Sequence, residues 1–185
     1  MLLVVLAGFA LGSIPFGVII GKILGVDIRE KGSGNIGATN AARVLGVGPG
    51  LLVLALDAGK GAAAAGIATY FAAPLWWLVA TGFAAILGHC FSPVLLGKGG
   101  KGVATALGVF VVLAPTLALV AVSVFLLVAG RTRVPALGSL GGITSATLYA
   151  FATSAPTPIR MLAVATTLLL VYTHRGNLAR LLTTS

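Results

Sequence analysis

The chain has 185 residues, of which 58% are hydrophobic and 8% are charged. Soluble domains carry about 25% charged residues, so this composition excludes an ordinary soluble domain and indicates an integral membrane protein. The formal net charge of +9 suits an anionic lipid surface or an anionic substrate, and we expect no nucleic-acid partner for so apolar a chain.

Six apolar runs predict an all-α membrane bundle. They cover residues 2–24, 44–73, 75–96, 103–130, 136–155 and 159–173. Short polar segments separate them, so we expect residues 1–185 to form a single domain. The first run resembles a cleaved signal at Ala10 and Gly12, but no basic residue precedes it and it continues past Pro15. We therefore interpret it as a retained helix.

The fourth run is too long for one ordinary span. It has 28 residues, and a single helix of that length would reach about 42 Å, against a hydrocarbon core of about 30 Å. Pro115 lies near its middle, and proline removes a backbone donor and disfavours helix in the residue before it. The run is therefore either one kinked helix or two short helices that turn at Ala114 and Pro115.

The distribution of positive charge favours two helices. Seven spans then result, and the polar segments 26–43, 97–102, 131–135 and 174–185 all lie on one side, with Arg160 on the other. These four segments contain Arg29, Lys31, Arg43, Lys98, Lys101, Arg131, Arg133, Arg175 and Arg180. A single fourth span would export Arg131 and Arg133. By the positive-inside rule we predict a seven-transmembrane-helix bundle with the N-terminus outside and the C-terminus in the cytoplasm.

Residues 27–43 form a candidate phosphate cradle. Gly32, Gly34 and Gly37 permit positive φ values that let successive amides converge on an anion. Further hydrogen-bond donors are Ser33, Asn35, Thr39 and Asn40. The spacing of residues 32–37 also matches G-x-G-x-x-G, but a dinucleotide site requires a preceding strand, and a charged run stands there instead. The alternative is an ordinary flexible cytoplasmic loop.

Residues 97–102 place Lys98 and Lys101 among four glycines where the next helix begins. Helix N-termini attract anions through their free amides and the helix dipole. The segment does not match the phosphate-binding motif G-x-x-x-x-G-K-[ST]. It is therefore either a second anion-binding element or a pair of positive anchors at the membrane surface.

Ionisable residues inside the apolar runs are further candidates. Asp57 and Lys60 lie three residues apart, so we expect them to pair or to face a polar cavity, with a structural ion pair as plausible as a catalytic role. We interpret His89 as an interfacial histidine. His174 and Asn177 follow the last run and point the same way if the helix continues, the alternative being an anchoring basic tail.

No nucleophile with a neighbouring base is legible in the sequence, and Cys90 is the sole cysteine. Two His and three Asp or Glu residues are too few for a site with two metal ions. We expect neither a metal nor another cofactor, so the chemistry would depend on bound anions.

Six strings of residues carry a resemblance to a known family. They are GSIPFG at 12–17, GSGNIGATN at 32–40, DAGKG at 57–61, GHCFS at 88–92, GGKGVAT at 99–105 and HRGN at 174–177. In this order and spacing the chain resembles the bacterial acyl-phosphate glycerol-3-phosphate acyltransferases. The resemblance spans nearly the whole chain.

The resemblance implies an enzyme with a seven-helix fold in the bacterial cytoplasmic (inner) membrane. Such an enzyme moves a fatty acyl group from acyl phosphate to the 1-hydroxyl of glycerol 3-phosphate at the cytoplasmic face, giving lysophosphatidic acid for phospholipid synthesis. Its partners are these two substrates and membrane lipid. Neither acyl-CoA nor acyl carrier protein is the direct donor, no metal is needed, and no obligate protein partner is expected.

The resemblance also implies a set of site residues. The substrate-binding residues are Ser33, Asn35, Arg43, Lys101, Ser139, His174 and Asn177, and the catalytic residues among them are Lys101, His174 and Asn177. One segment departs from the family, because Arg133 and Pro135 stand where an aromatic residue and a serine are usual. Ser139 corresponds to a serine further along that segment.

On this interpretation the protein holds two anions together, orients the hydroxyl and stabilises the oxyanion. Ser33, Arg43 and Lys101 bind phosphate groups, while His174 and Asn177 position glycerol 3-phosphate and the oxyanion. The proton acceptor is either His174 or a substrate phosphate. Two competing classes are a transporter or channel for a phosphorylated solute and a structural membrane scaffold.

Overall fold

The structure is a computed structural model that describes residues 1–183. Its elements in chain order are α1 (Leu2–Gly12), α2 (Phe16–Ile23), α3 (Ala38–Leu45), α4 (Val47–Tyr70), α5 (Leu75–Cys90), the 3₁₀ turn η1 (Pro93–Leu95), α6 (Val103–Leu113), α7 (Pro115–Thr132), α8 (Pro135–Ala152) and α9 (Thr157–Thr183). These residues contain no strand, as the sequence predicted.

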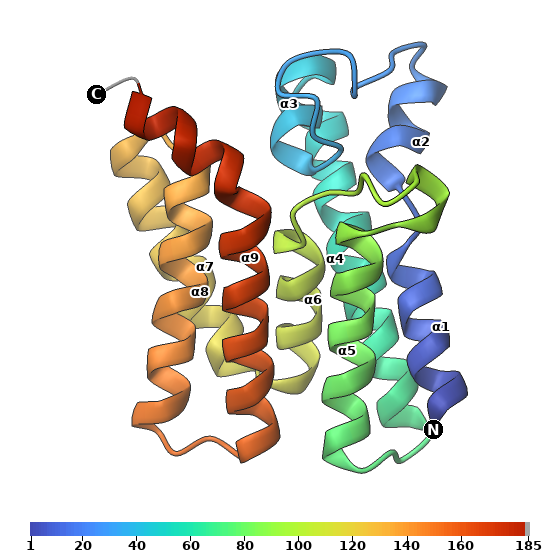
Figure 1. Cartoon of the computed structure of the whole chain (residues 1–185), viewed down its shortest axis with the longest axis vertical. Coiled ribbons are helices and arrows are strands. Elements are labelled where there is room, and N and C mark those ends of the chain that lie inside the picture. The colour runs from blue at the N-terminus through green and yellow to red at the C-terminus, as the bar shows by residue number, and fades with distance from the viewer. Residues whose placement is uncertain (184–185) are drawn as a thin grey trace.

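Proline sets several of the helix boundaries. The long run 103–130 divides into α6 and α7, with Pro115 as the first residue of α7, so the prediction of two helices is confirmed. Figure 1 shows α6 and α7 running in opposite directions. The predicted single helix over residues 2–24 is wrong, because it breaks into α1 and α2 at Pro15.

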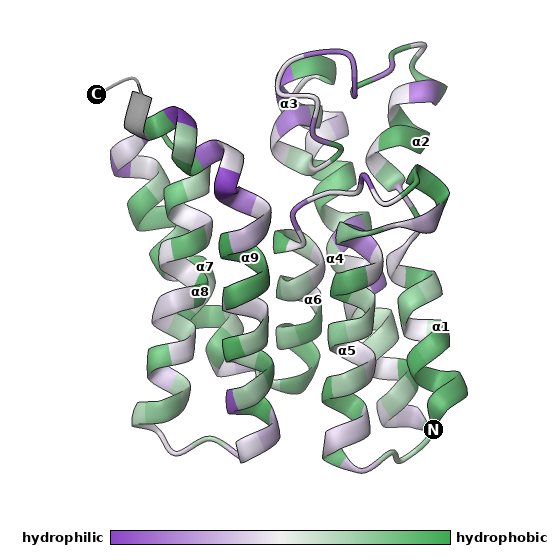
Figure 2. Cartoon of the chain, in the orientation of Figure 1, coloured by the Kyte–Doolittle hydropathy of each residue, from purple (hydrophilic) through white to green (hydrophobic). Residues whose placement is uncertain are grey.

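Four stretches have the length and apolar composition needed to cross a membrane. They are Leu2–Ile23, Val47–Tyr70, Leu75–Leu95 and Pro115–Thr132, while α6 is a shorter apolar helix. The hydrophilic loops of the chain gather at one end of the bundle (Figure 2), which is also the end where α9 finishes. The N-terminus lies at the opposite end (Figure 1).

Glycines allow the helices to approach closely. A Cβ on Gly12 would overlap the Ala85 carbonyl oxygen, which brings α1 against α5. A Cβ on Gly108 would overlap the carbonyl oxygen of Ala58, which brings α6 against α4. Small residues perform this function in membrane bundles because apolar side chains gain little by leaving lipid.

Two groups of helices result, and they enclose the site between them. The helices α1 to α6 pack on one another, α7 packs on α8, and α8 packs on α9. A cluster of buried apolar side chains that includes Ile86, Phe110 and Leu162 joins α5, α6 and α9 at the boundary. The polar end of this boundary carries the candidate site.

Candidate functional site

The segment between α2 and α3 is held in shape by one buried amide. Asn40 is 2% exposed, and its Oδ1 accepts the Ser33 backbone N–H at 2.8 Å. Its Nδ2 donates to the carbonyl oxygens of Ile28 and Lys31 at 2.9 and 3.1 Å. The side chain predicted to bind a ligand is therefore committed to its own loop. These bonds argue against the alternative of a loose surface loop.

Two of the three glycines in this segment adopt a positive φ. Gly32 and Gly34 have φ values of 62° and 71°, a region that glycine enters without strain. Gly37 has φ −80° and precedes α3 as its N-cap. Asn35 Oδ1 accepts the Gly37 N–H at 2.9 Å, which fixes the start of that helix.

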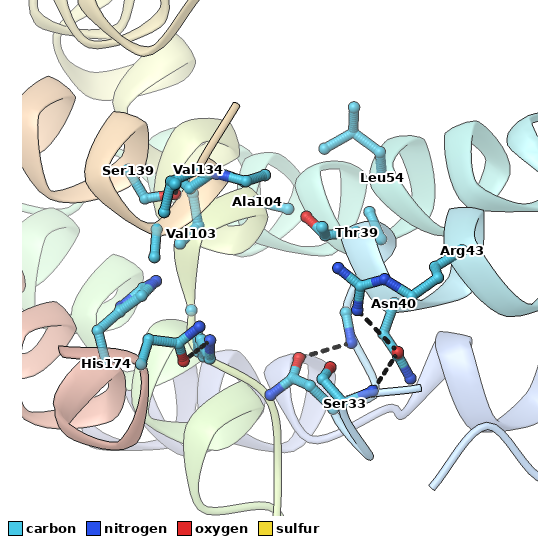
Figure 3. Close-up of a pocket in the computed structure, with 18 of the residues that line it drawn as sticks. Ser33, Thr39, Asn40, Arg43, Leu54, Val103, Ala104, Val134, Ser139 and His174 are labelled. Atoms are coloured by element: carbon cyan, nitrogen blue, oxygen red, sulfur yellow. Dashed lines mark hydrogen bonds between the residues drawn. The ribbon is translucent and has the colours of Figure 1, made fainter. Parts of the chain in front are cut away.

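A polar cavity of about 620 Å³ lies between this segment and α8 and α9. Residues predicted as the site all line it, namely Ser33, Asn35, Arg43, Lys101, Ser139, His174 and Asn177. Figure 3 shows Ser33 and Arg43 on one side of the space, and Ser139 and His174 on the other. The fold therefore brings together residues that are up to 144 positions apart in sequence, from Ser33 to Asn177.

The wall formed by α9 has a specific hydrogen-bond pattern. Because α9 continues to Thr183, His174 and Asn177 lie on one face of an unbroken helix. Lys101 donates to Asn177 Oδ1, and Thr173 Oγ1 donates to the Lys101 carbonyl oxygen at 3.1 Å. The glycine-rich segment is thus attached to α9 beside the cavity.

The ring of His174 has a defined orientation. Its Nδ1 lies 2.8 Å from the Leu170 carbonyl oxygen, and the His174 residue is 2% exposed. A carbonyl oxygen only accepts, so Nδ1 carries a proton and Nε2 is the basic nitrogen of the neutral ring. A histidine that accepts a proton at Nε2 must have this tautomer, in which Nε2 is unprotonated.

The cavity is strongly electropositive. Arg43, Lys101, Arg133 and Arg180 line it, and Asp57 is the one carboxylate among its lining residues in the described part of the chain. Burial lowers the pKa of Lys101, and the nearby charges of Arg180 and Arg43 lower it further. Crowded cations of this kind favour an anionic ligand, which relieves their mutual repulsion.

Sequence reasoning missed part of this lining. Arg180 was noted for topology alone, and Arg133 for topology and as a departure from the family pattern, yet both line the cavity. His89, interpreted from the sequence as an interfacial histidine, is 4% exposed and lines the cavity with Asp57, which the sequence did not indicate. The predicted pairing of Asp57 with Lys60 is confirmed by an ion pair of 2.9 Å.

An apolar groove of about 370 Å³ adjoins the polar cavity. It runs between α4, α6, α7 and α8, where Leu51, Leu107 and Phe110 line it. Residues that line both spaces are Ala38, Thr39, Leu54, Val103, Ala104, Phe125 and Ser139. A ligand with a charged head and a long apolar chain fits this combination.

Comparison with known proteins gives a consistent set of relatives. A family model described as glycerol-3-phosphate acyltransferase matches residues 2–184. The glycerol-3-phosphate acyltransferase of Anaeromyxobacter sp. (strain K) is 48% identical, covering 97% of this chain and 92% of that protein. The corresponding protein of Aquifex aeolicus is 45% identical, with 98% and 95% covered.

Solved structures agree with these sequences. The crystal structure of PlsY, an integral membrane glycerol 3-phosphate acyltransferase, in its glycerol 3-phosphate form superposes with a TM-score of 0.94 at 42% identity. The match covers 99% of this chain and 92% of that one. Its lysophosphatidic acid form superposes with a TM-score of 0.93.

Proposed function

The chain belongs to the glycerol-3-phosphate acyltransferase family, and we propose that it transfers a fatty acyl group from acyl phosphate to the 1-hydroxyl of glycerol 3-phosphate. The products are lysophosphatidic acid and phosphate. The observation that carries this proposal is the electropositive cavity joined to an apolar groove. Both substrates carry phosphate, and one also carries a long apolar chain.

Acyl phosphate is an activated anhydride, so the reaction needs positioning more than activation. The glycerol oxygen attacks the acyl carbonyl carbon, a C–O ester bond forms, and the bond from that carbon to the phosphate oxygen breaks. The hydroxyl proton leaves with the phosphate or passes to His174 Nε2. The tautomer of His174 is compatible with the second route, and the phosphate can serve in the first.

The roles of the residues follow from their places around the cavity. Ser33, Arg43 and Lys101 bind phosphate groups, assisted by Asn35 and Ser139 at the lining. Asn177 Oδ1 accepts from Lys101, so the Asn177 Nδ2 group is the one available to donate to a substrate oxygen. Asn177 and His174 orient glycerol 3-phosphate and the oxyanion.

We further propose that the whole chain acts as one domain with seven spans, formed by α1 with α2, α4, α5, α6, α7, α8 and α9. The turn between α6 and α7 and the gathering of hydrophilic loops at one end support this count. The positive-inside rule then places the cavity at the cytoplasmic face of the bacterial inner membrane, with the N-terminus outside. Neither a metal nor a protein partner enters the proposal.

The donor is tested with purified protein reconstituted in lipid. Palmitoyl phosphate and palmitoyl-CoA are compared as donors to labelled glycerol 3-phosphate. Lysophosphatidic acid from palmitoyl phosphate alone is the expected result. Product from palmitoyl-CoA alone would overturn the donor, and product from neither, in folded protein, would overturn the proposed reaction.

A further inference from the structure

A buried ionic cluster connects α4, α5 and the break between α1 and α2. Asp57, Lys60 and His89 are 1%, 4% and 4% exposed. Lys60 Nζ pairs with Asp57 Oδ1 at 2.9 Å and donates to the Ile14 carbonyl oxygen at 2.7 Å. That carbonyl stands just before Pro15, where the helix is interrupted. The Ile14 carbonyl oxygen also accepts the Phe16 N–H at 3.2 Å, so Lys60 adds a second hydrogen bond at the helix break.

His89 completes the cluster on the cavity side. Its Nδ1 faces Asp57 Oδ1 at 3.6 Å. It has no hydrogen-bond partner among the described residues. The carboxylate therefore lies against the ring without a hydrogen bond to it, and Nδ1 remains available for another contact. Ionisable groups at this depth are costly, and they persist where they support a site.

The other side of the same ring touches the glycine-rich segment. A Cβ on Gly100 would overlap His89 Nε2. The Gly100 N–H donates to the His89 carbonyl oxygen at 3.0 Å, and the Gly99 N–H donates to the Cys90 carbonyl oxygen at 3.1 Å. The main chain of residues 99 and 100 therefore lies directly on the last turn of α5 and against the imidazole.

We propose that Asp57 and His89 are positioning residues for Lys101: the carboxylate sets the imidazole, the imidazole forms the wall on which Gly100 rests, and Gly100 fixes the main chain from which Lys101 reaches Asn177. The inference rests on the proposed function, because it assigns a task to a group that we take to bind substrate phosphate. It also explains why glycine stands at position 100. No ligand contact is required of His89 itself.

The test is a double-mutant cycle between positions 100 and 89. Gly100→Ala places a methyl group where the ring lies, so it displaces the segment and misplaces Lys101. We expect kcat/KM for glycerol 3-phosphate to fall by about tenfold or more, with much of the loss in KM. His89→Asn keeps an amide donor in place of Nδ1 and removes the part of the ring that carries Nε2. For this variant we expect a smaller loss of kcat/KM, about threefold.

The combined variant discriminates a positioning role from a general packing role. In His89→Asn/Gly100→Ala the new methyl group occupies the space that the ring vacates, so activity should return to within about threefold of wild type. Gly59→Ala is the matched control, because a Cβ at Gly59 meets nothing within 4 Å. It should behave like wild type, and the thermal midpoints of all variants are measured in parallel.

Two results would overturn the inference. One is Gly100→Ala activity within about twofold of wild type, and the other is a combined loss that equals the product of the single losses. Both are distinct from a failure of the proposed function, in which wild-type protein itself gives no product from palmitoyl phosphate.

Discussion

The side chain of Lys101 donates a hydrogen bond to the side-chain oxygen of Asn177, across 76 positions of sequence. This bond places the ammonium group from the start of α6 beside the last turns of α9, and it fixes which end of the Asn177 amide faces a ligand. It also gives Lys101 a neutral partner, so its charge is left for an anion.

Replacing Lys101 tests that charge. Lys101→Ala should lower kcat/KM by roughly 100-fold, as for the removal of a preorganised group that stabilises negative charge. Lys101→Arg should retain more activity, because the charge remains although its geometry changes. The measurement is steady-state acyl transfer with each substrate varied in turn, and equal activity of the alanine variant would contradict the role.

The same residue predicts a pH dependence. The pKa of Lys101 lies below its ordinary value because of burial and of the charges of Arg180 and Arg43. In the proposed role the ammonium form is the one that binds phosphate. Affinity for inorganic phosphate should therefore weaken as the pH rises through that lowered pKa, starting below the usual lysine value of about 10.4. Lys101→Arg should keep its affinity to higher pH. Identical pH profiles of phosphate affinity for wild type and Lys101→Arg would contradict the assignment of Lys101 to phosphate binding.

Arg133 offers a test with a matched control. It lines the cavity, whereas Arg131, two residues earlier, is exposed and is not among the lining residues. Arg133→Ala should raise KM for the anionic substrates by about threefold to tenfold at low salt and less at high salt, because exposed charges are screened. Arg131→Ala should change KM little. Equal increases of KM in both variants would mean that only the net charge of the protein matters.

The cavity-lining residues that belong to the family's motifs could be predicted from the sequence, because each motif is a short continuous segment of the chain. Ser33 and Asn35 share one loop, Lys101 sits in one glycine-rich segment, and His174 and Asn177 share one turn of helix. The split at Pro115 was likewise predictable, because proline constrains the main chain wherever it stands.

Other features depend on contacts between distant segments, which sequence periodicity does not encode. Asn40 appeared to be a ligand donor, but its amide is consumed by the main chain of residues 28, 31 and 33. At the break near Pro15, Lys60 on another helix donates to the Ile14 carbonyl oxygen, which also accepts the Phe16 N–H. The apolar groove arises only when α4, α6, α7 and α8 come together.

A larger side chain in the apolar groove should change which lengths of acyl chain the protein accepts. Leu107 lines the groove but not the polar cavity, so Leu107→Trp should lower activity with palmitoyl phosphate by about tenfold, through steric overpacking, and spare a short octanoyl donor. KM for glycerol 3-phosphate should stay unchanged. Leu127→Trp is the control, because Leu127 is exposed and outside the groove. Equal losses with both donors would argue that the acyl chain lies elsewhere.

Asn40 should control the order of the loop that presents Ser33. Asn40→Ala removes three hydrogen bonds to main-chain groups and a longer one from Arg43. The three main-chain bonds are each worth about 1 kcal/mol, so the loop should lose roughly 2 to 3 kcal/mol of local stability. Hydrogen exchange at the Ser33 amide measures this directly. Asn40→Asp keeps the acceptor and loses the donors, so it should exchange at an intermediate rate. Unchanged exchange in both variants would show that the loop is held by other contacts.

The stoichiometry of the reaction in sealed vesicles tests the proposed acyl transfer most directly. Wild-type protein supplied with palmitoyl phosphate and glycerol 3-phosphate should release lysophosphatidic acid and inorganic phosphate in equal amounts, and Lys101→Ala should reduce both together. Passage of glycerol 3-phosphate across the membrane without formation of either product would rule out the proposed acyl transfer and favour a transporter.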